Sequence, residues 1–268
     1  MTTISTGVST ACAQNAKLPA ETMGSAPGGA IPPGRTMAGG RFNTFKGPAA
    51  RPLGRRATDH HRSFFPTRTP MSEDLIQQYR VIHGREAYGN TSVKNLPYLL
   101  PLLDDLKPAS IIDFGCGQST LADELQRATG ARIARYDPAI PKYSVRPEGK
   151  FDLLVNVDVL EHVPEDELEP IIADMAALAR NAIIIVDMGP AVLILPDGRN
   201  AHVTQQNEEW WKQRLGTHFP YLEPIRVRSR RRAAFKTWKT REARPLRHFL
   251  IFLKAEIIYR LRKITGRR

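Results

Sequence analysis

The chain has 268 residues, of which 41% are hydrophobic and 25% are charged, so it contains enough apolar material for a core and is not disordered throughout. No stretch approaches about eighteen uncharged apolar residues, which excludes a conventional transmembrane helix. Two cysteines, Cys12 and Cys116, are too few for a disulfide framework, a cysteine-rich zinc module or an iron–sulfur cluster. The N-terminal sequence lacks an apolar core flanked by basic residues, so no secretory signal is predicted and we expect a cytoplasmic protein.

The formal net charge of +12 is distributed unevenly along the chain. Residues 1–70 carry nine Lys and Arg against two Asp and Glu, residues 71–225 carry fourteen against twenty-three, and residues 226–268 carry sixteen against two. An acidic middle therefore lies between two basic ends. This pattern predicts a basic leader over 1–70, a domain over 71–225 and a basic tail over 226–268.

Glycine and proline are frequent in residues 1–70, and no hydrophobic period is sustained there. Such a segment buries too little apolar surface to offset its chain entropy, so a disordered leader is predicted. Two other interpretations remain open: Met71 is the true start of the protein, or the leader is a basic arm that binds an acidic partner.

The pattern changes at Ser72, where acidic residues open a helix with apolar positions at helical spacing. Residues 96–106 form an apolar run that Pro97 and Pro101 interrupt, and Thr120 with Asp123 matches a capping box for a later helix. Strands are predicted at 111–114, 131–136, 151–159 and 182–186, and helices at 119–129, 168–180 and 208–215. Strands that alternate with helices predict an α/β fold with a parallel sheet covered on both faces.

The segment 113–117, Asp-Phe-Gly-Cys-Gly, joins a predicted buried strand to a predicted helix. Gly115 permits a tight turn, and Gly117 lets the main chain approach a ligand with no side chain between them. Asp137 lies twenty residues after Gly117 at the end of the second predicted strand, where a carboxylate can accept both ribose hydroxyls. Together these features predict a nucleoside site; an ordinary strand-to-helix turn is the alternative.

Three segments resemble motifs of class I methyltransferases that use S-adenosylmethionine. Residues 113–117 resemble the first, glycine-rich motif, Tyr136-Asp137-Pro138 resembles the second, acidic motif, and residues 151–163, which end in Leu-Glu-His-Val, resemble the motif of the fourth strand. The resemblance covers about residues 75–215, and it departs from the family at Ser119, where the first motif has a third glycine. It implies a doubly wound, mostly parallel Rossmann-like sheet and S-adenosylmethionine as the cofactor.

The resemblance also implies which residues contact the cofactor. The first motif lines its amino-acid and ribose parts, Asp137 holds the ribose, and the fourth-strand motif flanks the adenine and methionine. The segment before the first motif often forms a lid in this family, although a core tyrosine with a satisfied histidine is an equal alternative here. The implied cofactor residues are Tyr79, His83, Asp113, Phe114, Gly115, Cys116, Gly117, Asp137, Pro138, Asn156, Val157 and Asp158.

The charge of the glycine-rich turn distinguishes between nucleoside cofactors. Asp113 would repel the pyrophosphate of a dinucleotide but attract the ammonium and sulfonium groups of S-adenosylmethionine. No Gly-Lys-Ser/Thr follows the turn, so a Walker-type phosphate loop is absent. The residues themselves therefore favour S-adenosylmethionine over NAD.

Methyl transfer requires alignment of the acceptor with the methyl group, and a base only where the acceptor must lose a proton. The candidates for catalysis are Glu161 and His162, which follow the strand at 151–159, and His202. A structural role for each is the alternative, because alignment alone can suffice. The scattered histidines show no metal-ligand spacing, so no metal is expected.

A polar loop follows the strand at 182–186 and begins with the turn Pro196-Asp197-Gly198. It is similar to a loop beside the acceptor pocket in bacterial and phage members of the methyltransferase family. Arg199 is a candidate to bind a carboxylate or phosphate of the substrate, and Asn200 and Tyr88 are further candidate acceptor residues. A loop whose polar groups bond only to one another is the alternative.

The basic tail contains a predicted helix over 245–268, opened by Pro245, with apolar residues three and four positions apart. Its basic amphipathic pattern predicts docking on an anionic membrane surface, which would make the protein peripheral to the membrane, and the run 250–253 favours lipid. An RNA-binding tail and a helix packed on the acidic domain remain open.

The sequence thus predicts a methyltransferase that acts on a small-molecule, sugar or lipid-linked acceptor. One alternative is an RNA methyltransferase recruited by its basic ends, and another is a non-catalytic nucleoside-binding or membrane adaptor module. No Asn/Asp-Pro-Pro-Phe/Tyr sequence follows the strand at 151–159, which argues against methylation of exocyclic amines of nucleic-acid bases.

Overall fold

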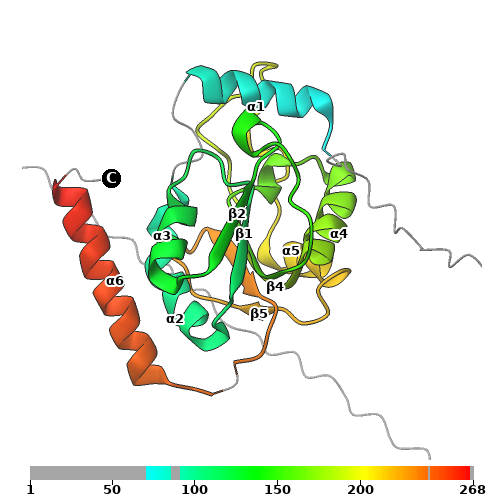
Figure 1. Cartoon of the computed structure of the whole chain (residues 1–268). Coiled ribbons are helices and arrows are strands. Elements are labelled where there is room, and N and C mark those ends of the chain that lie inside the picture. The colour runs from blue at the N-terminus through cyan, green and yellow to red at the C-terminus, as the bar shows by residue number, and fades with distance from the viewer. Residues whose placement is uncertain (1–70, 86–90, 241, 266–268) are drawn as a thin grey trace, which may run out of the picture. The chain divides into compact units, whose positions relative to one another are not determined.

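A sheet of six strands forms the centre of the computed structural model, which describes residues 71–85, 91–240 and 242–265 (Figure 1). These residues all belong to one structural unit, Arg62–Arg268. The predicted leader and the candidate acceptor residue Tyr88 lie outside the described residues.

The strand order in the sheet is β2-β1-β3-β4-β6-β5. Strands β1 to β4 are parallel, whereas β6 pairs antiparallel with both β4 and β5, so the sheet is mostly parallel, as predicted. The chain passes from β1 to β2 on one side and then to β3 on the other, which makes the carboxyl ends of β1 and β3 the topological switch point. The strands are β1 (Ser110–Phe114), β2 (Arg132–Tyr136), β3 (Phe151–Val157), β4 (Ala179–Asp187), β5 (Glu223–Pro224) and β6 (Arg232–Lys236).

Helices cover both faces of the sheet, because the buried strands alternate their apolar side chains between the two sides. One face packs against α2 (Leu96–Leu106) and α3 (Leu121–Thr129), the other against α4 (Leu168–Leu178) and α5 (Glu208–Gly216). In β4, for example, Ile183 packs in the apolar cluster on the α2 and α3 side, and Ile184 packs in the cluster on the α4 and α5 side. The predicted doubly wound fold is therefore confirmed. The remaining short elements are 3-10 turns at Ser92–Asn95, Pro141–Tyr143, Leu160–His162 and Glu165–Glu167.

The first helix, α1 (Glu73–Arg85), lies across the carboxyl ends of the parallel strands (Figure 1). Its buried apolar residues Leu75, Ile76 and Ile82 form a separate small cluster with Ala139 and Leu195, which follow β2 and β4. The acidic first turn, Glu73-Asp74, agrees with the predicted helix start. The helix thus covers the edge of the sheet where ligands bind in open α/β folds.

The last helix, α6 (Pro245–Thr265), begins at the predicted proline and packs along α2 (Figure 1). Among the residues described, no helix combines the length and apolar character needed to cross a bilayer.

Three local expectations are wrong. The run 96–106 forms a continuous helix despite Pro101, since burial of Leu99 and Leu103 against the sheet outweighs the single lost hydrogen bond. Strand β4 begins at Ala179 instead of 182, because parallel pairing with β3 extends back to that residue. Thr120 makes no side-chain cap bond to α3; instead the Ser119 hydroxyl accepts from the Leu121 N–H at 3.0 Å.

The sheet also continues past residue 225, where the charge distribution predicts the domain to end. Strand β6 lies between β4 and β5, and its Ala233 and Phe235 are fully buried. The strand follows a run of arginines, which conceals its apolar residues when composition is averaged over the tail. The predicted boundary at 225 therefore falls within the sheet.

Candidate active site

The glycine-rich turn has the backbone that its sequence predicts. Gly115 and Gly117 have positive φ angles of 74° and 52°, a conformation that favours glycine. The N–H groups of Gly115 and Cys116 both donate to the Tyr136 carbonyl, at 2.7 and 3.1 Å. A Cβ on Gly115 would lie 2.5 Å from Val159 Cγ2, so packing against the loop after β3 also excludes a side chain there.

Asp137 lies against this turn, as predicted. Its Oδ2 accepts the Gly117 N–H at 2.9 Å, and its Oδ1 accepts the Ala139 N–H at 2.9 Å. Burial raises the pKa of Asp137, and these backbone bonds oppose that rise. The acidic residue that follows β2 is therefore fixed beside the turn that follows β1.

Two buried acceptors lie at the switch point. Asp113 Oδ2 and Asn156 Oδ1 have no hydrogen-bond partner within the part of the chain that the structure describes. Burial raises the pKa of Asp113 to about 7, and the Asn156 amide donates to the Phe114 carbonyl at 2.9 Å. Unsatisfied buried acceptors are costly unless a ligand pairs with them. They fit a cofactor that carries an ammonium group and hydroxyl donors.

The apolar members of the predicted cofactor set are core side chains. Phe114 packs against Tyr136 with ring centroids 5.1 Å apart, and Val157 belongs to the cluster under α2 and α3. The Cys116 thiol is buried, and that burial raises its pKa, so it is not a reactive thiolate. These residues support the backbone of the site from within the core.

Helix α1 contacts the turns that surround the switch point. The Gln118 amide, in the turn after β1, donates to the His83 carbonyl at 3.1 Å, and Arg80 donates to the Pro138 carbonyl at 3.4 Å. Burial lowers the pKa of His83, while the nearby Asp137 carboxylate acts in the opposite direction. The hydroxyl of Tyr79 lies 2.8 Å from His162 Nδ1.

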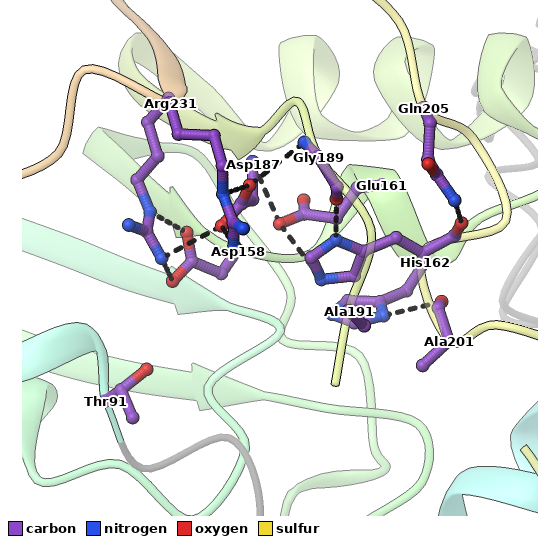
Figure 2. A network of polar contacts seen from close by, with 12 residues as sticks. Thr91, Asp158, Glu161, His162, Asp187, Gly189, Ala191, Ala201, Gln205 and Arg231 are labelled. Atoms are coloured by element: carbon purple, nitrogen blue, oxygen red, sulfur yellow. Dashed lines mark hydrogen bonds and ion pairs between the residues drawn. The ribbon is translucent and has the colours of Figure 1, made fainter. Parts of the chain in front are cut away.

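Asp158, predicted to flank the cofactor, is instead tied to arginines that the sequence analysis assigned to the tail. Its two oxygens accept from Arg232 at 2.7 and 2.9 Å, and it adopts a left-handed φ of 56°. Arg231 pairs with Asp187 at 2.8 Å, and Arg232 reaches the same carboxylate at 3.4 Å. Figure 2 shows this network beside Glu161. Asp187 was a missed candidate with a clear signal, since it directly follows the apolar strand predicted at 182–186.

Glu161, His162 and His202, the predicted catalytic candidates, are brought together. Glu161 is fully buried; its Oε1 accepts the Asp187 N–H at 3.0 Å, and its Oε2 has no hydrogen-bond partner among the described residues. Burial, and secondarily the carboxylate of Asp158, raises the pKa of Glu161 well above its usual value. The rings of His162 and His202 meet edge to face at 4.8 Å.

The two histidines have different hydrogen bonds. His202 Nδ1 lies 2.5 Å from the Gly189 carbonyl and therefore carries the proton, which leaves the lone pair of the neutral ring on Nε2. That Nε2 is 4.0 Å from Glu161 Oε1. His162 Nδ1 lies 2.9 Å from the Ala201 carbonyl, and burial lowers the pKa of His162 to about 4.

The expectation that the histidines are scattered is wrong in three dimensions. One ligand atom from each of Glu161, His162 and His202 lies within 4.8 Å of the others, close enough to share a cation. The guanidinium of Arg232, however, already acts on Glu161 electrostatically. Arg232 therefore competes with a cation for the negative charge of Glu161, although its direct partners are Asp158 and Asp187.

The loop after β4 forms one wall of a cavity of about 580 Å³. Asn200 holds this loop together: its Oδ1 accepts from the Ala191 and His202 N–H groups, and its amide donates to the Ala191 carbonyl. The Arg199 guanidinium is paired with Asp197 at 2.6 Å, so the predicted anion clamp already has a counter-ion. The cavity is lined by Pro164, Glu165, Arg199, Asn200, His202, Val203, Thr204, Gln205 and Gln206.

Comparison with solved structures finds several methyltransferases. Human N-acetylserotonin methyltransferase in complex with SAM is 14% identical, with a TM-score of 0.43, over 62% of this chain and 56% of that one. Magnesium protoporphyrin IX methyltransferase from Synechocystis is 20% identical, with a TM-score of 0.39, over 60% and 85%. A Burkholderia thailandensis toxoflavin-precursor N1-methyltransferase is 16% identical, with a TM-score of 0.40, over 62% and 86%.

The chain thus spans little more than half the length of the human enzyme that it matches. A search of curated protein sequences finds no significant match. A family model described as a methyltransferase domain matches residues 83–228, which is more than half of the chain and includes the glycine turn, Asp137, the Glu161–His202 cluster and the start of the arginine run. On this match and the fold just described, the chain belongs to the class I S-adenosylmethionine-dependent methyltransferases.

Proposed function

We propose that the protein transfers the methyl group of S-adenosylmethionine to a small, polar, hydroxyl-bearing acceptor bound in the cavity beside His202. One observation carries the proposal: His202 lines that cavity while its Nδ1 is fixed by the Gly189 carbonyl and its Nε2 faces the buried Glu161. This arrangement resembles a base with an orienting group on one side and a carboxyl on the other.

The cofactor supplies a methyl group activated by positive sulfur. On the protein side, Asp113 and Asn156 offer unsatisfied acceptors at the switch point, and Asp137 is positioned to accept the ribose hydroxyls with its remaining lone pairs. Helix α1 covers this edge and would exclude water from the bound cofactor. Tyr79 and His83 belong to this helix and contribute to the cofactor site by holding it over the edge of the sheet.

His202 is the proton acceptor in this proposal. A proton taken up at Nε2 makes an imidazolium, and this positive charge in turn favours the ionised form of the Glu161 carboxyl 4.0 Å away. His162 is a positioning residue, because its low pKa of about 4 makes it a poor base near neutral pH. Asn200 positions His202 through the hydrogen bond to its backbone N–H at 2.9 Å.

The cavity does not favour an anionic acceptor. Its one arginine is neutralised by Asp197, Glu165 adds a carboxylate, and amides from Asn200, Gln205 and Gln206 supply neutral donors and acceptors. A volume of about 580 Å³ lies within the usual range for small-molecule sites, which is roughly 300–1,000 Å³. A sugar, free or lipid-linked, has suitable hydroxyl groups and size.

The decisive experiment has two parts. Calorimetry first measures S-adenosylmethionine binding to the full chain; absence of binding would indicate an adaptor that retains only the fold. A labelled-methyl assay then presents cell extract in small-molecule, lipid, RNA and protein fractions. Label in the small-molecule or lipid fraction supports the proposal. Label in RNA, with affinity that falls steeply as salt rises, would contradict it.

The base is tested by His202→Asn, with His218→Asn as the matched control. His218 pairs with Glu169 on the surface at 2.6 Å and does not line the cavity. With the labelled fraction as acceptor, His202→Asn is expected to reduce kcat about 10²–10⁴-fold. Its cofactor affinity should remain within about twofold of the native protein. Equal rates for the two variants would exclude His202 as the base.

A further inference from the structure

Helix α6 carries a row of large apolar side chains that face solvent. Eight of the eleven large hydrophobic residues that are exposed in the described part of the chain lie on this one helix, with exposed fractions from 40% to 81%. They recur at spacings of three and four, which places them along one side of the helix. We call this set the outer face of α6: Leu246, Phe249, Leu250, Leu253, Ile257, Ile258, Leu261 and Ile264.

The opposite side of α6 is already fixed to the domain. Phe252 packs edge to face on Tyr98 of α2, with ring centroids 5.0 Å apart. Arg247, near the start of the helix, pairs with Asp104 at 2.6 Å, and Arg262, near its end, pairs with Glu124 at 2.5 Å. The helix is therefore anchored along its length by residues outside its outer face.

A further contact anchors the middle of α6. Arg228, in the loop before β6, pairs with Glu256. The same guanidinium lies over the rings of Tyr98 and Tyr259, at 5.6 and 4.6 Å from their centroids. These contacts hold the outer face toward solvent, because rotation of the helix would break the pairs with α2, α3 and this loop together.

The charge on the helix selects the partner. Residues 245–265 carry five Lys and Arg against one Glu. Three of these basic residues, Lys254, Arg260 and Lys263, are exposed close to the apolar row. An exposed apolar row flanked by basic residues is the pattern of a helix that lies in the interface of an anionic bilayer. A symmetric contact with a second copy would instead bring these like charges together.

We propose that the outer face of α6 docks the protein on a membrane surface that contains anionic lipid. The apolar side chains enter the boundary between headgroups and acyl chains, and Lys254 and Lys263 meet the lipid phosphates, whereas Arg260 is already paired with Glu256 at 2.8 Å. This proposal rests on the helix surface alone and does not depend on the acceptor proposed above.

Cosedimentation of the full chain with vesicles tests the proposal. The protein should bind vesicles of phosphatidylglycerol mixed with phosphatidylcholine, bind pure phosphatidylcholine much more weakly, and dissociate as salt rises. The double variant Leu253→Glu/Ile257→Glu should weaken binding to the anionic vesicles by at least about tenfold. Lys254→Glu should weaken binding to anionic vesicles about tenfold and leave the weak binding to neutral vesicles unchanged.

Val145→Glu is the matched control, because Val145 is 82% exposed and lies outside α6. It introduces one negative charge, as each of the two α6 substitutions does, and should bind vesicles like the native chain. Undiminished binding by the α6 double variant would show that another basic segment carries the affinity and would overturn the proposal. Sedimentation velocity of the same variants tests whether the face binds a second copy of the chain. If the native protein is a dimer and the double variant is a monomer, the face would be a dimer interface. Thermal unfolding of each variant confirms that it is folded.

Discussion

Asp113 is the residue whose surroundings are most specific to a bound cation. It occupies the end of β1, is 3% exposed, and has a carboxylate oxygen without a partner among the described residues. Desolvation raises its pKa to about 7. The folded protein alone therefore favours the protonated acid, whereas an ammonium or sulfonium ligand favours the carboxylate.

The resulting prediction concerns pH. Because the folded pKa of Asp113 lies above the ordinary value of 3.8, the stability from the protonated group is present below about pH 4 and is lost as pH rises through about 7. Asp113→Asn removes this pH-dependent loss of stability, because the amide does not ionise. In thermal unfolding without cofactor, the Tm of the native chain should fall between pH 5 and pH 8 by several degrees more than that of the variant, at roughly 2–4 °C per kcal/mol. Parallel Tm curves would contradict the assignment.

The same substitution should weaken binding of the cofactor. Asp113→Asn removes the negative charge that faces the ammonium group, and the S-adenosylmethionine dissociation constant should rise at least about tenfold near pH 8. Calorimetry measures this directly. Asp152→Asn, at the amino end of β3 away from the switch point, is the control and should leave the constant unchanged.

The Glu161–His162–His202 cluster gives a second residue-scale prediction. We expect activity to persist after chelation with EDTA, because the Arg232 charge already acts on Glu161 and His202 accepts the proton. The measurement is the labelled-methyl rate before and after chelation. A rate that disappears with EDTA and returns with one divalent cation would replace the base assignment with a metal site.

At the scale of elements, β6 matters because it brings two arginines to the ends of β3 and β4. Arg232 opens β6 and is nearly buried, with a side chain 10% exposed between Asp158 and Asp187. Asp158 follows β3, as Glu161 does, and Asp187 ends β4 and donates its N–H to Glu161. A strand from the basic tail therefore supplies the counter-ions for acidic groups of the predicted domain.

Arg232→Ala should destabilise the protein by about 3 kcal/mol, because it leaves the largely buried Asp158 without its two-bond partner and Asp187 with Arg231 alone. The Tm should fall by roughly 6–12 °C. The neighbouring Arg230 is exposed, and Arg230→Ala should change stability by less than about 0.5 kcal/mol. Thermal unfolding of both variants checks this, and equal Tm values would show that the ion pairs are not stabilising.

Elements with a strong local period could be predicted, and those determined by pairing could not. The run 182–186 is apolar throughout and predicts a buried strand, but its extension to Ala179 depends on pairing with Phe151 in β3. In β6, the five residues Arg232–Lys236 contain only three apolar positions between basic ends, and only antiparallel pairing with β4 makes them a strand.

For the molecule as a whole, the domain extends into the basic C-terminal region. A chain of residues 71–225 lacks β6 and the buried side chains of Ala233, Phe235 and Trp238. It should show no cooperative thermal transition by circular dichroism, since β4 loses its neighbour and part of both cores is removed. The chain 71–268 is the control and should unfold cooperatively; a cooperative 71–225 chain would restore the boundary at 225.

The amino-acid sequence by itself determined the alternation of strands and helices, the glycine turn, the acid twenty residues beyond it and the family that these motifs resemble. Each is a local pattern, because turn chemistry and hydrophobic period act within a few residues. Only the tertiary structure decided that Asp158 pairs with Arg232 and that Glu161 and His162 meet His202. Contacts between residues some forty to seventy positions apart depend on sheet order and on how loops return to one edge, and charge or spacing along the chain does not encode that geometry.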